Sequence, residues 1–311
     1  MDLALVRRLT AVSGRLRASW ANAALESDRS LLRRRLGRFI HSSARGRQPL
    51  ADLLSRFARP QWDALVFGGF LRDLMLFAGR AIPRDIDLVV QSSEPAGLSK
   101  ALSGYLRRRT RFGGYVLGNK GWRLDVWPIE QTWALREGLI DSVGPEGLVR
   151  STFLNLEAVA VSLRSRGRGG RRVYDHGFFE GVRDRLLDIN LEENPYPELC
   201  IVRSLITAAS LNFGLSMRLV GYIDTHSRSI GVDSLLEVQE RHYGFVRRYG
   251  DYLDFWLHFL RKRIARTRSS SITLPQLPYG QLELLGSTNV EIAIDDDRRS
   301  TQAHSGQTIR A

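Results

Sequence analysis

The segment RAIPRDIDLVV, residues 80–90, places two aspartates, Asp85 and Asp87, in what is otherwise an apolar strand. Residues two apart in a strand project from the same face, so both carboxylates share one face while Ile86 and Leu88 point into a core. A buried carboxylate is costly unless a cation meets it, and two neighbouring carboxylates also repel each other. The segment therefore predicts a strand that carries a cation-dependent acidic site on one face.

Two other segments supply parts of such a site. VFGGFLRD (66–73) puts Gly68 and Gly69 between a predicted strand and a predicted helix, where backbone N–H groups can approach an anion. WRLDVW (122–127) alternates as a strand and carries Asp125, a candidate third carboxylate, on its polar face. Carboxylate oxygens on strands suit Mg²⁺, so these segments together predict a magnesium site.

The charge of the chain indicates an anionic partner. The 311 residues include 46 lysines and arginines against 33 aspartates and glutamates, which gives a formal net charge of +13. All the basic residues except Lys100, Lys120 and Lys262 are arginines, whose planar fork can donate two parallel hydrogen bonds to phosphate. A genome that favours arginine codons is the alternative explanation, but it does not account for the excess of positive charge. RNA, DNA or nucleotide phosphate is the expected partner.

Cysteine usage and hydropathy exclude several classes of protein. Cys200 is the only cysteine, which excludes an intramolecular disulfide and a multi-cysteine zinc site. No apolar run approaches the roughly 18 residues of a membrane helix, and the N-terminus lacks a secretory apolar core. We therefore expect a cytoplasmic protein with no membrane partner. An organelle transit peptide is an alternative interpretation of the arginine-rich first 45 residues.

Periodicity divides the chain into four parts. Residues 1–50 form a basic helical N-terminal extension, with helical spacing over 3–24 and 28–42, which is either an RNA-facing surface or a cover over the main domain. From 268 to 311 the periodicity disappears, and we predict a disordered tail. Between these ends, strands are expected at 63–67, 85–90, 113–119 and 122–129, and helices at 97–109, 150–163, 197–213, 215–226, 231–248 and 251–267.

GGFLRDLMLFAGRAIPRDIDLVV resembles the head-domain signature of the tRNA nucleotidyltransferases (CCA-adding enzymes) and bacterial poly(A) polymerases of the polymerase-β superfamily. RLDVW, RSTFLNLEAVAV, VYDHGFFEGVRDRLL and RSLITAASLNFGL resemble later segments of the family in the same order. The resemblance implies an α+β fold: a nucleotidyltransferase head at 51–150, with a small mixed sheet and flanking helices, then a helical neck and truncated body at 151–267.

The resemblance also implies a reaction. In the family, two Mg²⁺ ions activate an RNA 3′-hydroxyl, which attacks the α-phosphate of an NTP and releases pyrophosphate without a template. ATP or CTP is the expected substrate, RNA is the expected acceptor with tRNA as the leading candidate, and no protein partner is predicted. The implied metal ligands and catalytic residues are Asp85, Asp87 and Asp125, and the implied nucleotide-binding residues are Gly68, Gly69, Arg72, Asp73, Arg150, Asn155 and Arg203.

The sequence departs from the family pattern on the helix that reads the base. With that helix aligned on Arg203, Cys200 replaces an arginine, Pro197 lies near the family's aspartate, and Glu198 is one residue out of register. A second departure is Ser151, which follows Arg150 where the family has aspartate. These differences leave the choice of base open and argue against CCA addition itself.

Two alternatives to RNA extension remain. The chain could be a nucleotidyltransferase that modifies a protein or small-molecule acceptor, or a non-catalytic RNA-binding relic of the family. Individual residues also have structural alternatives: Asp125 could pair with an arginine, in which case Glu130 is the other third carboxylate, Arg203 could simply neutralise the acids of the head, and Asn155 could serve an internal hydrogen bond.

Overall fold

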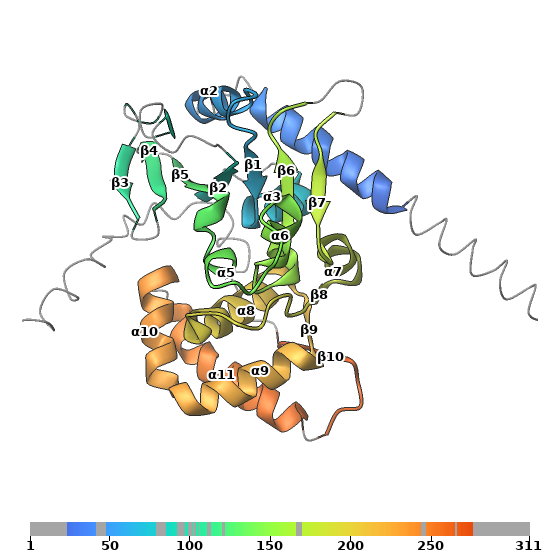
Figure 1. Ribbon diagram of the computed structural model, residues 1–311. Helices are drawn as coiled ribbons and strands as arrows, with labels where there is room; N and C mark the ends of the chain where they lie inside the picture. The colour runs from blue at the N-terminus through green and yellow to red at the C-terminus, as the bar shows by residue number, and fades with distance from the viewer. Residues whose placement is uncertain are drawn as a thin grey trace, which may run out of the picture.

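The computed structural model describes residues 24–41, 48–78, 85–91, 97–98, 102, 104, 106–110, 113–119, 122–165, 170–243, 247–264 and 266–275. Figure 1 shows a head built on one large sheet, with a group of helices, the body, packed beneath it. Most of the predicted first helix (3–24) lies outside the described residues.

The head sheet has seven described strands in the order β3-β4-β5-β2-β1-β6-β7. The β2–β5 pair is parallel and the other pairs among these strands are antiparallel, so the sheet is mixed, as predicted. The strands are β1 (Leu65–Phe67), β2 (Asp85–Val90), β3 (Leu106–Arg109), β4 (Tyr115–Asn119), β5 (Trp122–Pro128), β6 (Val159–Ser162) and β7 (Val173–Asp175).

Alternation of side chains gives this sheet two different faces. On the packed face, Ile86, Leu88, Leu124 and Val126 belong to one buried cluster together with Val66. The opposite face, which we call the acidic face, carries Asp85, Asp87 and Asp125. Farther along the strands, the acidic face is covered where Leu65 and Val89 pack with residues of η1 (Ile129–Gln131) and α6 (Pro145–Arg150). The aspartates lie beyond this cover.

The packed face is covered by helices from both ends of the head. These are a helix at 24–40 and the helices α2 (Gln48–Phe57), α3 (Gly69–Phe77) and α7 (Phe178–Asp184). Leu32, Leu36, Phe39 and Ile40 of helix 24–40 are buried in the same cluster as the sheet. Helix 24–40 is therefore a cover over the head and part of its core, and the predicted boundary after residue 50 falls inside α2.

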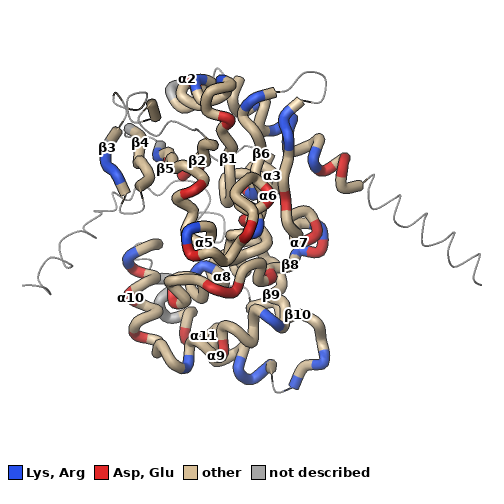
Figure 2. Tube along the Cα trace, in the orientation of Figure 1, with Lys and Arg blue, Asp and Glu red and all other residues tan. Residues whose placement is uncertain are grey.

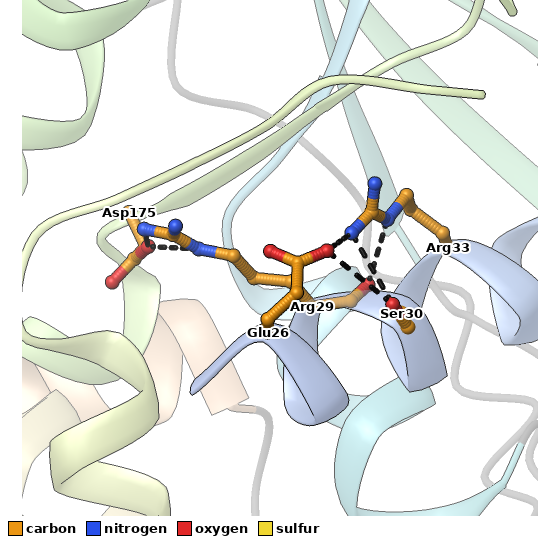
Figure 3. Close-up of polar contacts among 5 residues, drawn as sticks. All are labelled: Glu26, Arg29, Ser30, Arg33 and Asp175. Atoms are coloured by element: carbon orange, nitrogen blue, oxygen red, sulfur yellow. Dashed lines mark hydrogen bonds and ion pairs between the residues drawn. The ribbon is translucent and has the colours of Figure 1, made fainter. Parts of the chain in front are cut away.

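Polar contacts also fix helix 24–40. Arg29 donates to Asp175 at 2.7 Å, and Arg33 pairs with Glu26 along the helix itself (Figure 3). Arg35 donates to the carbonyl oxygen of Leu74 at 3.1 Å and also to that of Met75, so a guanidinium caps the C-terminal end of α3. Such a cation at a helix C-terminus is favoured by the helix dipole.

Two helices predicted from the sequence are corrected by the structure. Residues 106–109, expected as the end of a helix, form β3. The helix expected at 150–163 is wrong, because residue 150 ends α6, residues 155–157 form a single 3-10 turn and residues 159–162 form β6. Every residue of β6 is buried between β1 and β7, and a short apolar run of this kind does not distinguish strand from helix by periodicity. The predicted head boundary at residue 150 is wrong for the same reason, because β6 and β7 complete the head sheet.

The body packs around the fully buried Trp256 and begins where the head sheet ends. Its helices are α8 (Pro197–Leu211), α9 (Met217–Ile230), α10 (Val232–Tyr243) and α11 (Arg247–Ile264). A small sheet of β8 (Leu186–Leu187), β9 (Gly214–Ser216) and β10 (Ser271–Thr273) closes it, and short helices α5 (Trp133–Arg136) and η2 (Asn155–Glu157) complete the described elements.

The strand β10 corrects the predicted tail. Ile272 pairs with Leu215 of β9 and is 4% exposed, so the prediction of disorder from residue 268 is wrong for residues 268–275. A three-residue strand is too short to show periodicity, and its pairing partner lies more than fifty residues earlier in the chain. Residues 276–311 lie outside the described part of the chain.

Within the described residues, each helix is either too short or too polar to cross a bilayer.

Replacing Leu36 with alanine should destabilise the head by about 2 to 5 kcal/mol, because Leu36 is fully buried between helix 24–40 and the sheet cluster. Urea denaturation measures this change in the free energy of unfolding. Arg38→Ala, an exposed change on the same helix, should stay within about 0.5 kcal/mol of wild type. Equal stability of wild type and Leu36→Ala would contradict the assignment of this helix to the core.

Candidate functional site

The acidic face brings three sequence-predicted carboxylates together. Asp87 of β2 lies directly opposite Asp125 of β5 in the parallel register, and Asp85 lies opposite Arg123. Neighbouring strands are about 4.8 Å apart, and Asp85 and Asp87 project from the same side of β2. The register of one strand pair thus assembles the whole cluster.

Electrostatics at Asp87 reflect this crowding. Burial is the largest cause that raises the pKa of Asp87, and repulsion from Asp125, Asp85 and Glu157 adds to it, against a smaller lowering by Arg203. The resulting pKa is about 7. An ordinary aspartate is fully ionised at neutral pH, so the cluster holds more negative charge than the surrounding arginines compensate.

Arg123 supplies a cation inside the cluster. Its guanidinium donates to both carboxylate oxygens of Asp125, at 2.7 and 3.0 Å, and lies 3.8 Å from Asp85. The arginine pairing that the sequence left open for Asp125 is therefore present. The alternative third carboxylate, Glu130, lies in η1 and is exposed.

The Gly-Gly turn lies against the carboxylates. Gly68 has a φ of +73°, and a side chain there would meet the carboxylate of Asp87 at 3.7 Å. The N–H of Gly68 donates to Val159, so the prediction that this N–H is available to a phosphate is wrong. Because the first N–H groups of a helix have no partner within it, Gly69 and Phe70 at the start of α3 offer the donors instead.

Arg72 and Asp73 form an ion pair on the first turns of α3. The guanidinium and carboxylate are 2.8 Å apart, and the guanidinium lies over Gly69. Burial raises the pKa of Asp73, against the opposing effect of Arg72. The pair therefore lies beside the Gly68 turn, which also contacts Asp87.

Sequence reasoning missed Glu157, which is the fourth acid near the cluster. It lies at the end of η2 and pairs with Arg203 of α8 at 3.3 Å, so an acid of the head meets a cation of the body. Against the effect of burial, the charge of Glu157 raises the pKa of Arg203, and a hydrogen bond with Tyr243 of α10 raises it further. No local sequence motif identifies Glu157 as a site residue, because its partners lie on helices more than forty residues away in the chain.

Two predicted nucleotide-binding residues have other positions. Asn155 uses its side-chain amide within the chain, donating to the carbonyl of Leu186 at 3.1 Å and accepting from the N–H of Asp188 at 3.0 Å. This is the structural alternative that the sequence allowed. Arg150 is exposed at the end of α6 and is not part of the cluster of aspartates.

The helix that departs from the family pattern is α8. Pro197 is its first residue, and Cys200 is buried within the body core. Burial raises the pKa of the Cys200 thiol to about 12, which makes it an unreactive apolar side chain at neutral pH. Of the residues considered on this helix, Arg203 is the one that reaches the acidic cluster.

The geometry of the three carboxylates meets only some of the requirements of the predicted magnesium site. Three hard oxygen donors and an uncompensated negative charge fit a divalent cation in chemical terms. Among the described residues, however, no three acidic, histidine or cysteine side chains converge as a ligand set. The carboxylate of Asp125 is turned onto Arg123 instead. Asp85, Asp87 and Asp125 are the residues that would hold a divalent cation, and Asp125 would do so only in a rotamer that does not pair with Arg123.

No protein-family model and no curated protein matches the sequence. The Thermotoga maritima CCA-adding enzyme, solved in complex with tRNA, matches with a TM-score of 0.50 and 15% identity, over 73% of this chain and 55% of that chain. A CCA-adding enzyme solved with CTP matches at 0.49 and 16% identity, over 69% and 54%, respectively. The Bacillus stearothermophilus CCA-adding enzyme in complex with CTP matches at 0.47 and 19% identity, over 63% and 48%.

The match with the Thermotoga enzyme establishes the fold. The chain shares the fold of this enzyme, with a mixed-sheet head followed by a helical body, and this confirms the predicted α+β fold class. Within that class, the proteins it resembles in fold are CCA-adding enzymes, as the sequence motifs indicated. The chain spans about half the length of these enzymes.

Asp87→Asn should stabilise the fold when no divalent cation is present. As pH rises from about 4 to 7, the unfolded chain loses this proton before the folded chain does, so wild-type stability falls across that range. Asparagine removes the repulsion, and the free energy of unfolding at pH 7.5 should rise by up to about 4 kcal/mol. Near pH 4 the two proteins should differ little, and urea denaturation with EDTA measures both differences.

A buried carboxylate that has a cation partner provides the control. Asp175, with a 6% exposed side chain, pairs with Arg29, so Asp175→Asn should destabilise at neutral pH. If Asp87→Asn and Asp175→Asn lower stability alike at pH 7.5, the acidic face is not an electrostatically strained site.

Proposed function

We propose that this chain is a metal-dependent nucleotidyltransferase that adds a nucleoside monophosphate from an NTP to the 3′ end of an RNA and releases pyrophosphate. ATP or CTP is the proposed donor, and tRNA is the leading candidate acceptor. The observation that carries this proposal is the in-register placement of Asp87 and Asp125, with Asp85 beside them, against the Gly68 turn. The fold shared with CCA-adding enzymes supports it.

Asp85, Asp87 and Asp125 would hold Mg²⁺ in this proposal. When bound, the cation supplies Lewis-acid stabilisation of the charge that develops on the entering and leaving oxygens. Asp87 is the carboxylate that a bound cation would stabilise most, because its burial and its acidic neighbours disfavour an uncompensated negative charge. Arg123, released from Asp125, becomes a second cation beside the phosphates.

The N-terminal turn of α3 would bind the triphosphate. This helix has nine residues, and its positive dipole end and the N–H groups of Gly69 and Phe70, which have no partner within the helix, lie at the same end. Gly68 allows the chain to pass close to Asp87, which brings the anion site and the proposed metal site together. Arg72, held over Gly69, adds a full positive charge.

The nucleotide would lie between the head and α8 of the body. Arg203 is close enough to Asp87 to lower its pKa, and it is oriented by Glu157 and Tyr243. These contacts make Arg203 the body residue best placed to reach a nucleotide whose phosphates lie on α3. Cys200 is buried and uncharged, so it offers no equivalent contact.

The net charge of +13 favours RNA over a protein or small-molecule acceptor, because a polyanion gains from every neutralised phosphate. A protein acceptor would instead place the label from an α-labelled NTP in a polypeptide. A non-catalytic relic would label nothing and would bind RNA equally with or without Mg²⁺. The strained aspartates argue against a relic, because they cost stability without the cation.

The test is incorporation from each α-³²P-labelled NTP into total RNA with Mg²⁺. The wild type should label RNA, and Asp85→Ala/Asp87→Ala should reduce the rate by at least about 1,000-fold, because two of the three proposed metal ligands are lost. EDTA should abolish labelling in the wild type.

Asp184→Ala, an exposed carboxylate on α7, is the matched control and should keep wild-type activity. Label in a protein band would show that the acceptor is a protein and not RNA. No label from any NTP, with a folded protein that still binds RNA, would overturn the proposed reaction in favour of the relic.

A further inference from the structure

Part of the positive charge gathers on the head away from the acidic face. Residues 29–51 contain seven arginines and no aspartate or glutamate, and residues 158–174 contain five arginines and no acid. These segments are more than one hundred residues apart in the chain. The structure brings their described parts together at the end of the β6–β7 hairpin.

Arg171 makes the contact between the two segments. A side chain at Gly37 would meet its guanidinium at 3.4 Å, and its Nε donates to the carbonyl of Leu163 at 3.1 Å. The backbone of Arg172 hydrogen-bonds to Ser162 across the hairpin, and the residue is exposed.

We define the arginine ridge as Arg34, Arg38, Arg164, Arg171 and Arg172. Arg34 and Arg38 are exposed residues of helix 24–40 close to Gly37. Arg164 follows Leu163 and Arg172 follows Arg171, the two residues that are joined by a hydrogen bond across the hairpin. Figure 2 shows lysine and arginine positions in blue at the ends of β6 and β7 that meet the hairpin loop and on the neighbouring helix.

The ridge differs from the other arginines of the same helix. Arg29 and Arg33, nearer the start of the helix, each pair with a carboxylate (Figure 3). Within the described residues, no carboxylate forms an ion pair with Arg34, Arg38 or Arg172. The end of the helix beside the hairpin is thus charged without internal compensation, while its other end is neutralised.

Two partly buried arginines, Arg171 of the ridge and Arg35 next to it, also indicate that positive charge is uncompensated here. Burial lowers the pKa of Arg171 with no opposing effect from an acid. Burial also lowers the pKa of Arg35, and repulsion from Arg38 and Arg34 lowers it further. Crowded cations of this kind are relieved by an external anion, and planar guanidinium groups are suited to phosphate.

The ridge is separate from the proposed active site. Ala160 of β6 lies level with Phe67, which lies level with Asp87, so two strand spacings and four residues separate Asp87 from Arg164. This corresponds to a separation of about 15 Å or more. A single NTP at the aspartates does not reach the ridge, whereas an RNA of several nucleotides can.

We propose that the arginine ridge is a docking surface for the sugar-phosphate backbone of RNA. This proposal rests on the proposed function for its choice of RNA as the polyanion, and it adds a second contact away from the reacting 3′ end. The ridge contributes affinity without base readout, because guanidinium groups that contact phosphates carry no sequence information. Its contacts are therefore expected to be strongly salt-dependent.

The test is fluorescence anisotropy with a fluorescein-labelled RNA hairpin that has a single-stranded 3′ end. The variant Arg34→Gln/Arg38→Gln/Arg164→Gln/Arg172→Gln should bind at least about 10-fold more weakly at about 100 mM KCl, with a salt slope smaller by about 3. The four-lysine counterpart keeps the charge and should retain most of the affinity, which separates charge from folding.

The matched control removes four exposed charges from the body: Arg241→Gln/Lys262→Gln/Arg266→Gln/Arg268→Gln. It should keep wild-type RNA affinity. Equal weakening by both quadruple variants would show a general effect of net charge, and unchanged affinity of the ridge variant would show no contact; either result overturns the proposal. Loss of binding to phosphatidylserine vesicles with unchanged RNA affinity would overturn it in favour of a membrane surface.

The binding assay needs no catalysis, so it separates the two proposals. If the wild type labels no RNA, the proposed reaction fails while anisotropy still decides whether the ridge binds RNA. If the wild type is active, the ridge variant should keep kcat at saturating RNA and raise KM about as much as it weakens binding. A fall in kcat with unchanged KM would contradict a docking role.

Discussion

The parallel pairing of β2 with β5 is the constraint on which the rest of the site depends. It sets Asp87 level with Asp125, and alternation along β2 adds Asp85 to the same face. A shift of β2 by one residue would send Asp85 and Asp87 toward the buried cluster of the packed face, so the apolar alternation that forms the core also fixes the register. The acidic cluster is thus a consequence of how the sheet must pack.

The same constraint explains the arrangement of cations around the cluster. Arg123 comes from β5 itself, whereas Arg203 comes from the body and is held by Glu157 of the head. Neither arginine removes the repulsion at Asp87, whose pKa stays near 7. The ion pair between Glu157 and Arg203 joins the head to the body beside these carboxylates. Because both residues also affect the pKa of Asp87, a change in the distance between head and body would change the electrostatics of the site.

The parts of this structure that can be predicted from the sequence are those that depend on residues close together in the chain. The Gly68 turn, the helix after it and the alternation around Asp87 all lie within thirty residues, and their periods identify them. β6 and β10 were not predicted, because each is a short strand whose identity comes from a distant partner. Glu157 was missed for the same reason, since its role follows from residues on α8 and α10.

The distribution of charge bears on how a polyanion would approach. An RNA 3′ end is itself negative and meets repulsion at Asp85, Asp87 and Asp125 unless a cation is present. Long-range attraction must therefore come from elsewhere on the molecule, and the uncompensated arginines beside the hairpin are a source of it. Placing attraction about 15 Å from the acids lets a long chain be held while a lone NTP gains nothing from it. Such an arrangement would separate affinity, which the arginines would provide, from chemistry, which the aspartates and their cation would provide.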